Sequence, residues 1–242
     1  ATARSCRGIA HTGGYTRCSR PLAGARQAAL KNSGMIRTEG EARAFLDSLC
    51  DQSAVQRLEK LVEALCIENE RQNLVARSTW EDVWVRHSAD SAQLLQFLPT
   101  SKSPGPWIDL GSGAGFPGLV IAAVRPDWPV HLIESRRLRY EWLSKVTVEL
   151  DLLHCTVHGM RLENVSSFQA GVISARAFAP LPKLLRLAGR FATPQTHWLL
   201  PKGRGAAEEM AEIAKPDVAF HVEQSITSEE AMILVGKGVR RT

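Results

Sequence analysis

Long hydrophobic runs are absent from this 242-residue sequence. No apolar stretch approaches the roughly 20 residues that a membrane-spanning helix needs, and no secretory signal region is visible. Cysteine is scarce as well. The five cysteines form an odd set without a C-x-x-C pair, which argues against a zinc site and favours a reducing compartment. We therefore expect a cytoplasmic protein with no membrane partner and no metal site.

Acidic residues are missing from the first 38 positions, which hold seven of the 30 basic residues. The rest of the chain is therefore slightly acidic, so binding of a nucleic acid would need a local basic cluster. Three interpretations stay open for residues 1–34: an organellar transit peptide, a disordered basic arm, or a non-native segment that precedes a start at Met35. We expect this segment to be disordered in each case.

Helical periodicity begins after this segment. Apolar residues recur at helical spacing from Glu41 to about Glu70, which predicts two amphipathic helices. A further helix is predicted from Trp80 to about Phe97, and it carries His87 and Asp90 on one face. These two side chains could lock the helix onto a sheet or bind a substrate, and both interpretations stay open. Residues 35–100 are thus expected to form an N-terminal helical extension.

Strand-like runs alternate with helical patterns in residues 101–242. Strands are expected near residues 107–110, 130–133, 154–158, 171–175, 196–200, 218–223 and 231–235. The alternation predicts an α/β fold with a Rossmann-like, mostly parallel sheet of seven strands. The last two runs leave no room for a helix between them, which predicts an antiparallel finish. Ligands of such sheets bind at the carboxyl ends of the strands.

The most informative stretch is residues 107–118, with the sequence WIDLGSGAGFPG. It has the pattern of a strand, a tight loop and the start of a helix. Glycine suits such a loop because the backbone needs positive φ angles and must let a ligand approach closely. Gly113, Gly115 and Gly118 spell G-x-G-x-x-G, the dinucleotide fingerprint. Gly111, Gly113 and Gly115 equally spell the D-x-G-x-G-x-G loop of S-adenosylmethionine-dependent methyltransferases.

Several residues favour S-adenosylmethionine over a dinucleotide. Pro117 stands at the helix start, where a pyrophosphate would need free N–H groups, and proline has none. Asp109 suits a cationic cofactor better than an anionic one. Glu134 ends the next strand, where it can accept hydrogen bonds from both ribose hydroxyls. An NAD(P)-dependent oxidoreductase stays as an alternative, but Tyr140 does not belong to the Tyr-x-x-x-Lys pair that would supply a proton.

Further candidate residues follow the third and fourth strands. Leu162 can contact an adenine ring, and Arg176 ends the fourth strand. Methylation of an exocyclic amine would require [Asp/Asn]-Pro-Pro-aromatic here, and methylation of an activated carbon would require a nucleophilic cysteine; neither is present. Guanine N7 carries a free lone pair, so its methylation needs alignment and exclusion of water but no general base. We therefore expect no catalytic acid or base, with Arg176 as a positioning cation.

Four motifs carry a family resemblance: RHSADS, WIDLGSGAGFPGLVIAAVRP, VISARAFAPL and LLPKGR. In this order and spacing, residues 36–242 resemble the ribosomal small-subunit methyltransferase G family (glucose-inhibited division protein B), which makes N7-methylguanosine in 16S rRNA. The resemblance implies a class I methyltransferase domain that uses S-adenosylmethionine. It implies cofactor contacts by Gly111, Phe116, Leu162, Glu163 and Arg176. It also gives four matching positions that we expect to bind the substrate: Arg86, His87, Asp90 and Lys202.

Local basic groups predict contacts with 16S rRNA in the small ribosomal subunit. They lie on two expected helices and one loop: Arg136, Arg137, Arg139 and Lys145; Lys183, Arg186 and Arg190; and Lys202 and Arg204. Phosphate contacts give affinity without reading the sequence, so the choice of guanine is expected to depend on RNA shape and an extruded base. We expect a monomer, because no long apolar face is left unassigned. A non-catalytic RNA-binding or ribosome assembly factor stays as an alternative.

Overall fold

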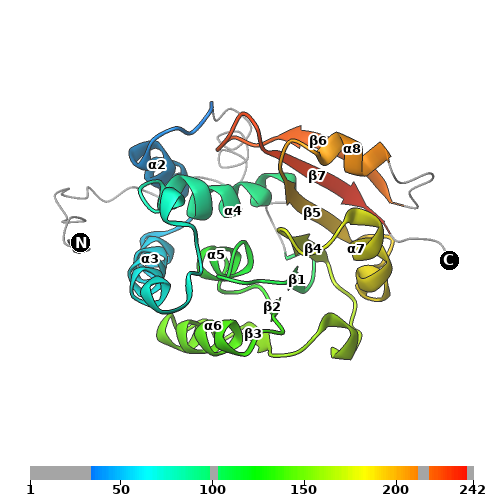
Figure 1. Ribbon diagram of the computed structural model, residues 1–242, viewed down its shortest axis with the longest axis horizontal. Coiled ribbons are helices and arrows are strands. Elements are labelled where there is room, and N and C mark those ends of the chain that lie inside the picture. Colours follow the sequence, from blue (N-terminus) through cyan, green and yellow to red (C-terminus); the bar gives the residue numbers. More distant parts are fainter. Residues whose placement is uncertain (1–33, 99–102, 212–217, 239–242) are drawn as a thin grey trace.

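The computed structural model describes residues 34–98, 103–211 and 218–238 (Figure 1). The expectation of disorder for residues 1–34 lies outside these ranges, apart from Gly34. Within them, no helix is both long enough and apolar enough to cross a membrane.

A seven-stranded sheet forms the centre of the molecule, in the order β3-β2-β1-β4-β5-β7-β6. The strands are β1 (Trp107–Leu110), β2 (Val130–Ile133), β3 (Cys155–His158), β4 (Val172–Ala175), β5 (His197–Lys202), β6 (Ala219–Gln224) and β7 (Met232–Lys237). Strands β1 to β5 pair in parallel, whereas β7 is antiparallel to both β5 and β6. The predicted fold class is confirmed, including the antiparallel finish. Because β2 and β4 flank β1 on opposite sides, the chain reverses its direction of winding at β1.

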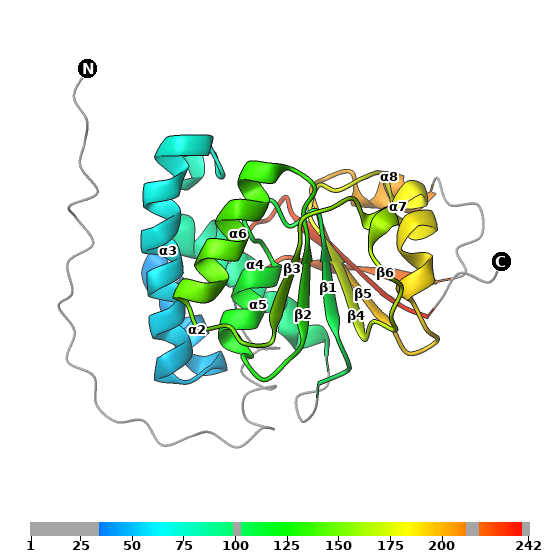
Figure 2. The same cartoon turned by 90° about the horizontal axis from the view of Figure 1, so that it is seen from below.

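Helices cover both faces of this sheet (Figure 2). One face carries α2 (Glu39–Leu49), α3 (Gln52–Gln72), α5 (Gly118–Val124) and α6 (Arg137–Glu149), and the other carries α7 (Leu181–Ala188) and α8 (Ala206–Ala211). Alternation along β1 supplies both cores: Trp107 packs with the first set of helices and Ile108 with the second.

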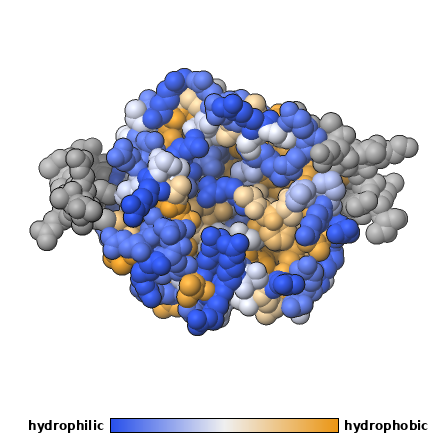
Figure 3. All heavy atoms as spheres, viewed as in Figure 1, coloured by the Kyte–Doolittle hydropathy of each residue, from blue (hydrophilic) through white to orange (hydrophobic). Residues whose placement is uncertain are grey.

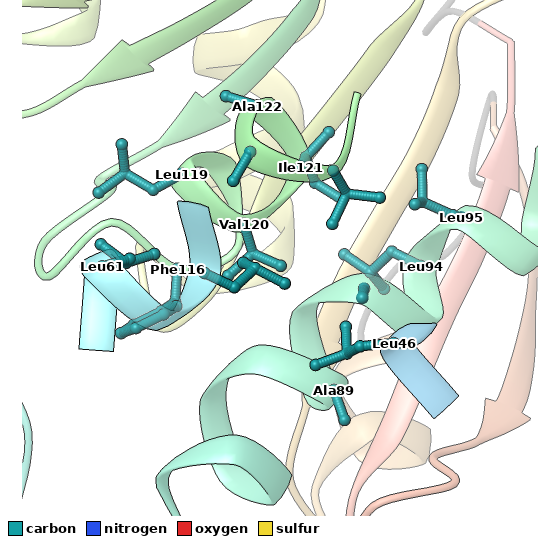
Figure 4. Close-up of a cluster of buried hydrophobic side chains, with 14 of the residues drawn as sticks. Leu46, Leu61, Ala89, Leu94, Leu95, Phe116, Leu119, Val120, Ile121 and Ala122 are labelled. Carbon is teal, nitrogen blue, oxygen red and sulfur yellow. The ribbon is translucent and has the colours of Figure 1, made fainter. Parts of the chain in front are cut away.

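The two predicted amphipathic helices are confirmed as α2 and α3. Thr38 and Glu41 form a capping box at the start of α2, and the Asp51 side chain caps α3. The buried faces of both helices join the same core as α5. Figure 4 shows part of this junction, where Leu46 of α2, Leu61 of α3 and residues of α5 come together. Residues before the sheet therefore share one core with it.

The predicted helix from Trp80 to about Phe97 is present from Val83 on, but it is not a regular α-helix. The structure has three short helices instead: the π-helix η2 (Trp84–Ala89), α4 (Asp90–Ala92) and the 3-10 helix η3 (Gln93–Phe97). The start of η2 is fixed by Glu39, whose Oε1 accepts a hydrogen bond from the Trp84 N–H at 3.0 Å. Within the segment, Ser91 Oγ donates to the His87 carbonyl at 2.6 Å and so competes with regular backbone bonding. A π-helical turn contains one residue more than an α-helical turn, so the side chains that follow it are rotated relative to those of a regular α-helix.

Gly118, the first residue of α5, should not tolerate a side chain. A Cβ there would lie 2.3 Å from Leu132 Cδ2 and 2.9 Å from the Asp109 carboxylate, and both neighbours are fully buried. We expect Gly118→Ala to lower the free energy of unfolding by about 1–3 kcal/mol, measured by urea denaturation. Gly189→Ala is the matched control, because Gly189 has a φ of −53° and nothing lies within 4 Å of its added Cβ. Equal stabilities of the two variants would contradict this packing.

Candidate functional site

The glycine loop after β1 forms the first wall of the site. Gly111, Gly113 and Gly115 have φ angles of +68°, +58° and +108°, a region that side chains disfavour. This explains the alternating glycines and confirms the predicted strand, loop and helix. Phe178, from the loop after β4, lies against the first of these glycines. A Cβ on Gly111 would come within 2.8 Å of the Phe178 ring.

Asp109 holds this loop to the neighbouring strand. Its side chain is fully buried, and Oδ1 accepts a hydrogen bond from Ser174 Oγ of β4 at 2.7 Å. Its Oδ2 accepts a longer bond, 3.3 Å, from the N–H of Gly118. Trp107 Nε1 donates to the same Ser174 hydroxyl at 2.8 Å. Burial raises the pKa of Asp109, while these hydrogen bonds and the charge of Arg176 oppose the rise. Its carboxyl group thus ties β1, β4 and α5 together.

Glu134 ends β2 directly beside the glycine loop. It is buried, and its two oxygens accept hydrogen bonds from the N–H groups of Gly113 at 3.0 Å and Arg136 at 2.8 Å. A carboxylate oxygen has two acceptor positions, so each oxygen keeps one for a ligand hydroxyl. This geometry suits a ribose with two free hydroxyls.

The loop after β3 forms the next part of the wall. Its short helix η4 (Leu162–Asn164) has a buried Leu162, which packs in the core, and an exposed Glu163. The Arg190 guanidinium donates to the carbonyls of Leu162 and Val165. Two donors of Arg190 are therefore used inside the protein, which weakens its assignment to RNA contact.

His87 joins the π-helix η2 to the glycine loop. Its buried ring stacks on Phe116 with 4.9 Å between ring centroids, and Nε2 lies 3.0 Å from Thr79 Oγ1. Among the described residues, Nδ1 has no hydrogen-bond partner. Burial first, and then the charges of Arg176 and Arg86, lower the pKa of His87 to about 3. The imidazole is therefore neutral at physiological pH.

The remaining predicted residues, apart from Arg86, form two ion pairs. Arg176 Nη1 lies 3.7 Å from Asp90 Oδ2, and its guanidinium carbon lies 5.4 Å from the centroid of the Phe116 ring. Lys202 Nζ lies 2.7 Å from Glu209 Oε2, which also accepts the N–H of Leu181. Arg86 is exposed and has no ion pair within the described ranges.

A cavity of about 900 Å³ brings these side chains together. Its lining includes all four residues predicted to bind substrate, and Arg176 as well: Arg86, His87, Asp90, Arg176 and Lys202. It also includes Phe178 and the turn between β6 and β7, which the sequence did not suggest. Hydrophilic residues cover much of the face viewed in Figure 3, with apolar residues between them. Of the residues predicted to bind the cofactor, only Arg176 lines this cavity. The others lie outside its lining: Gly111, Gly113, Gly115, Phe116, Glu134, Leu162 and Glu163.

The His87 environment gives a pH prediction. A histidine with a folded-state pKa of about 3 stays neutral while the unfolded chain takes up a proton near pH 6.5, so its contribution to stability falls as the pH drops below 6.5. In an NMR titration from pH 5 to 8, we expect the His87 ring signals to stay constant. Free imidazole in the same sample serves as the titrating reference. A titration midpoint for His87 above pH 5 would contradict the structure.

The fold is shared with solved methyltransferases. A SAM-dependent methyltransferase from Aquifex aeolicus superimposes with a TM-score of 0.50 at 16% identity, covering 62% of this chain and 89% of that chain. A geranyl diphosphate methyltransferase in complex with SAM gives a TM-score of 0.50 at 11% identity, covering 63% and 85%. These likenesses concern the fold alone.

Sequence similarity extends over most of the chain. The family model described as rRNA small subunit methyltransferase G matches residues 54–232. The ribosomal RNA small subunit methyltransferase G of Erythrobacter litoralis is 57% identical over 209 residues, covering 86% of this chain and 100% of the relative. That of Novosphingobium aromaticivorans is 52% identical over 203 residues, covering 83% and 88%. This chain belongs to the rRNA small subunit methyltransferase G family.

Proposed function

We propose that this protein transfers the methyl group of S-adenosylmethionine to N7 of a guanine in 16S rRNA of the small ribosomal subunit. The observation that carries this proposal is the cavity beside the glycine loop, which is lined by cations but by no side chain poised as a base. Asp90 and Glu209 are both engaged with protein donors, and the low pKa of His87 makes it a weak base. An acceptor that already has a free lone pair fits such a site.

The described residues fit S-adenosylmethionine on the other side of the glycine loop. The three alternating glycines let the loop take positive φ angles that other residues disfavour, and an added Cβ would collide with Phe178 at Gly111 and with Leu119 at Gly115. Glu134 would accept the ribose hydroxyls, the Leu162–Glu163 turn would border the adenine, and Phe116 and Arg176 would border the methionine part. When bound, the cofactor supplies an electrophilic methyl group on a sulfonium.

The protein's contribution to the reaction is alignment. The His87 ring stacks on Phe116, and Asp109 is hydrogen-bonded inside the protein. These contacts hold in place the residues that separate the glycine loop from the cavity. A guanine held there would present N7 to the methyl carbon, and exclusion of water would favour direct displacement. Positive charge passes from the sulfonium to the base during this step, so the site needs no new counter-charge. Asp90 and Glu209 can therefore remain in their internal ion pairs.

RNA binding is proposed to use the basic residues that lack internal partners. Of the predicted cations, Arg137, Lys145, Lys202 and Arg204 are paired with Glu141, Glu149, Glu209 and Glu230. Within the described ranges, no ion pair occupies Arg86, Arg136, Arg139, Lys183 or Arg186. The second group is the better candidate for phosphate contacts, because its charges are free to release counterions from RNA.

The remaining parts of the proposal concern the chain as a whole. Residues 35–100 would serve as a helical extension of a methyltransferase domain formed by residues 101–242, since both share one core. We propose a monomer that acts in the cytoplasm, where small ribosomal subunits are its partner. Its large exposed apolar residues support the monomer, because they are spread over several elements.

A methyl-transfer assay tests the reaction. The protein is incubated with labelled S-adenosylmethionine and small subunits that lack the modification, and the rRNA is then treated with borohydride and aniline. We expect label in the rRNA and chain scission at a single guanine, and excess S-adenosylhomocysteine should prevent both. Label without scission would show that the acceptor atom is not N7. Absence of transfer would favour the assembly-factor alternative.

Cofactor binding by Glu134 gives a second prediction. In Glu134→Gln the amide group must turn its NH₂ toward the N–H of Gly113 or Arg136, and the charge that favours ribose hydroxyls is lost. We expect the Kd for S-adenosylhomocysteine in calorimetry to rise about 10- to 100-fold, the effect of losing hydrogen bonds to a charged group. Glu149→Gln is the control, because Glu149 lies at the far end of α6 and is about half exposed. Unchanged affinity in Glu134→Gln would remove Glu134 from the cofactor site.

A further inference from the structure

Asp90 is the acidic group that forms an ion pair with Arg176. The Arg176 side chain is 31% exposed, it follows β4 directly, and its single ion pair within the described ranges is the 3.7 Å contact with Asp90 Oδ2. Asp90 and the Phe116 ring, 5.4 Å from the guanidinium carbon, are the two contacts among the described residues that place this guanidinium. A change that displaces Asp90 is therefore expected to displace Arg176 as well.

Asp90 is fixed through its other oxygen. Oδ1 accepts hydrogen bonds from Thr227 Oγ1 at 2.6 Å and from Gln93 Nε2 at 2.9 Å. These two donors fix the orientation of the Asp90 carboxylate. In this orientation, Oδ2 faces Arg176. Both donors come from outside the loop that carries Arg176.

Gln93 extends this chain of bonds to the turn between β6 and β7. It is 1% exposed, and its Oε1 accepts the N–H of Ile226 at 2.9 Å. Its Nε2 also lies 3.0 Å from Ser225 Oγ. Ser225 lines the cavity, whereas Gln93 does not. One buried amide thus connects a cavity wall to the carboxylate that orients Arg176.

We propose that Gln93 is a positioning residue for Arg176, acting through Asp90. The inference rests on the proposed function, in which Arg176 binds the cofactor. Packing alone does not account for an amide here, because a leucine of similar size would fill the same buried space. The amide is needed because the turn offers a donor, the Ile226 N–H, and Asp90 offers an acceptor, and a glutamine side chain satisfies both.

A double-mutant cycle separates positioning from general stability. We compare the wild type, Gln93→Leu, Arg176→Ala and the double variant by calorimetric titration with S-adenosylmethionine. We expect Gln93→Leu to raise the Kd about 5- to 10-fold, Arg176→Ala to raise it about 10- to 100-fold, and the double variant to match Arg176→Ala within about 2-fold. A residue that only stabilises the fold would weaken binding by the same factor in both backgrounds, and that result would overturn the proposal.

Two further variants complete the experiment. Gln72→Leu is the matched control, and its affinity should equal that of the wild type. Gln72 ends α3, where its amide bonds Glu68 of the same helix and the Leu138 carbonyl of α6. Thr227→Val removes the second donor to Asp90 and replaces Gln93→Leu in the cycle if the latter fails to fold. A wild-type affinity in Arg176→Ala would overturn the proposal together with the role of Arg176. Failure of methyl transfer to RNA would instead count against the proposed reaction, because this cycle needs no RNA.

Discussion

The buried carboxyl group of Asp109 is the interaction on which the rest of the site depends. A carboxyl group without water is costly unless its oxygens are bonded, and here Ser174 and Gly118 supply the donors. Those two donors belong to β4 and to the start of α5. The same group therefore fixes the spacing between the loop that follows β1 and the strand that precedes Arg176. Trp107 completes the arrangement by bonding the Ser174 hydroxyl from within β1.

This constraint has consequences on both sides of the glycine loop. On one side, the loop turns the Gly113 N–H toward Glu134, so the carboxylate at the end of β2 is oriented before any ligand arrives. On the other side, Phe116 becomes a platform for His87, and Arg176 lies near the same ring. Two arginines and burial keep His87 neutral. A neutral ring beside two cations suits the proposed alignment of a flat, uncharged base better than proton transfer.

Much of the fold could be predicted because its signals are local. Each strand begins and ends within two residues of its predicted bounds, since apolar runs and turn residues mark both ends. The glycine loop could be predicted because positive φ angles favour glycine. The π-helical geometry between Trp80 and Phe97 was not predicted, because Glu39, more than 40 residues earlier, bonds the start of η2. No local pattern contains that partner.

For the site too, local motifs indicated some residues, whereas distant contacts that no motif contains determine others. Four residues were predicted from motif positions, and the cavity brings them together: Arg86, His87, Asp90 and Lys202. The sequence left open whether Asp90 binds substrate or locks the helix. The structure shows why both interpretations seemed equal: Asp90 lies in the cavity lining and is also bonded to Thr227, 137 residues away. Gln93 was missed because its partners sit in the last turn of the sheet. One Asp90 oxygen accepts two hydrogen bonds and the other faces Arg176. In the proposed site, locking the helix and orienting the arginine would therefore be the same role.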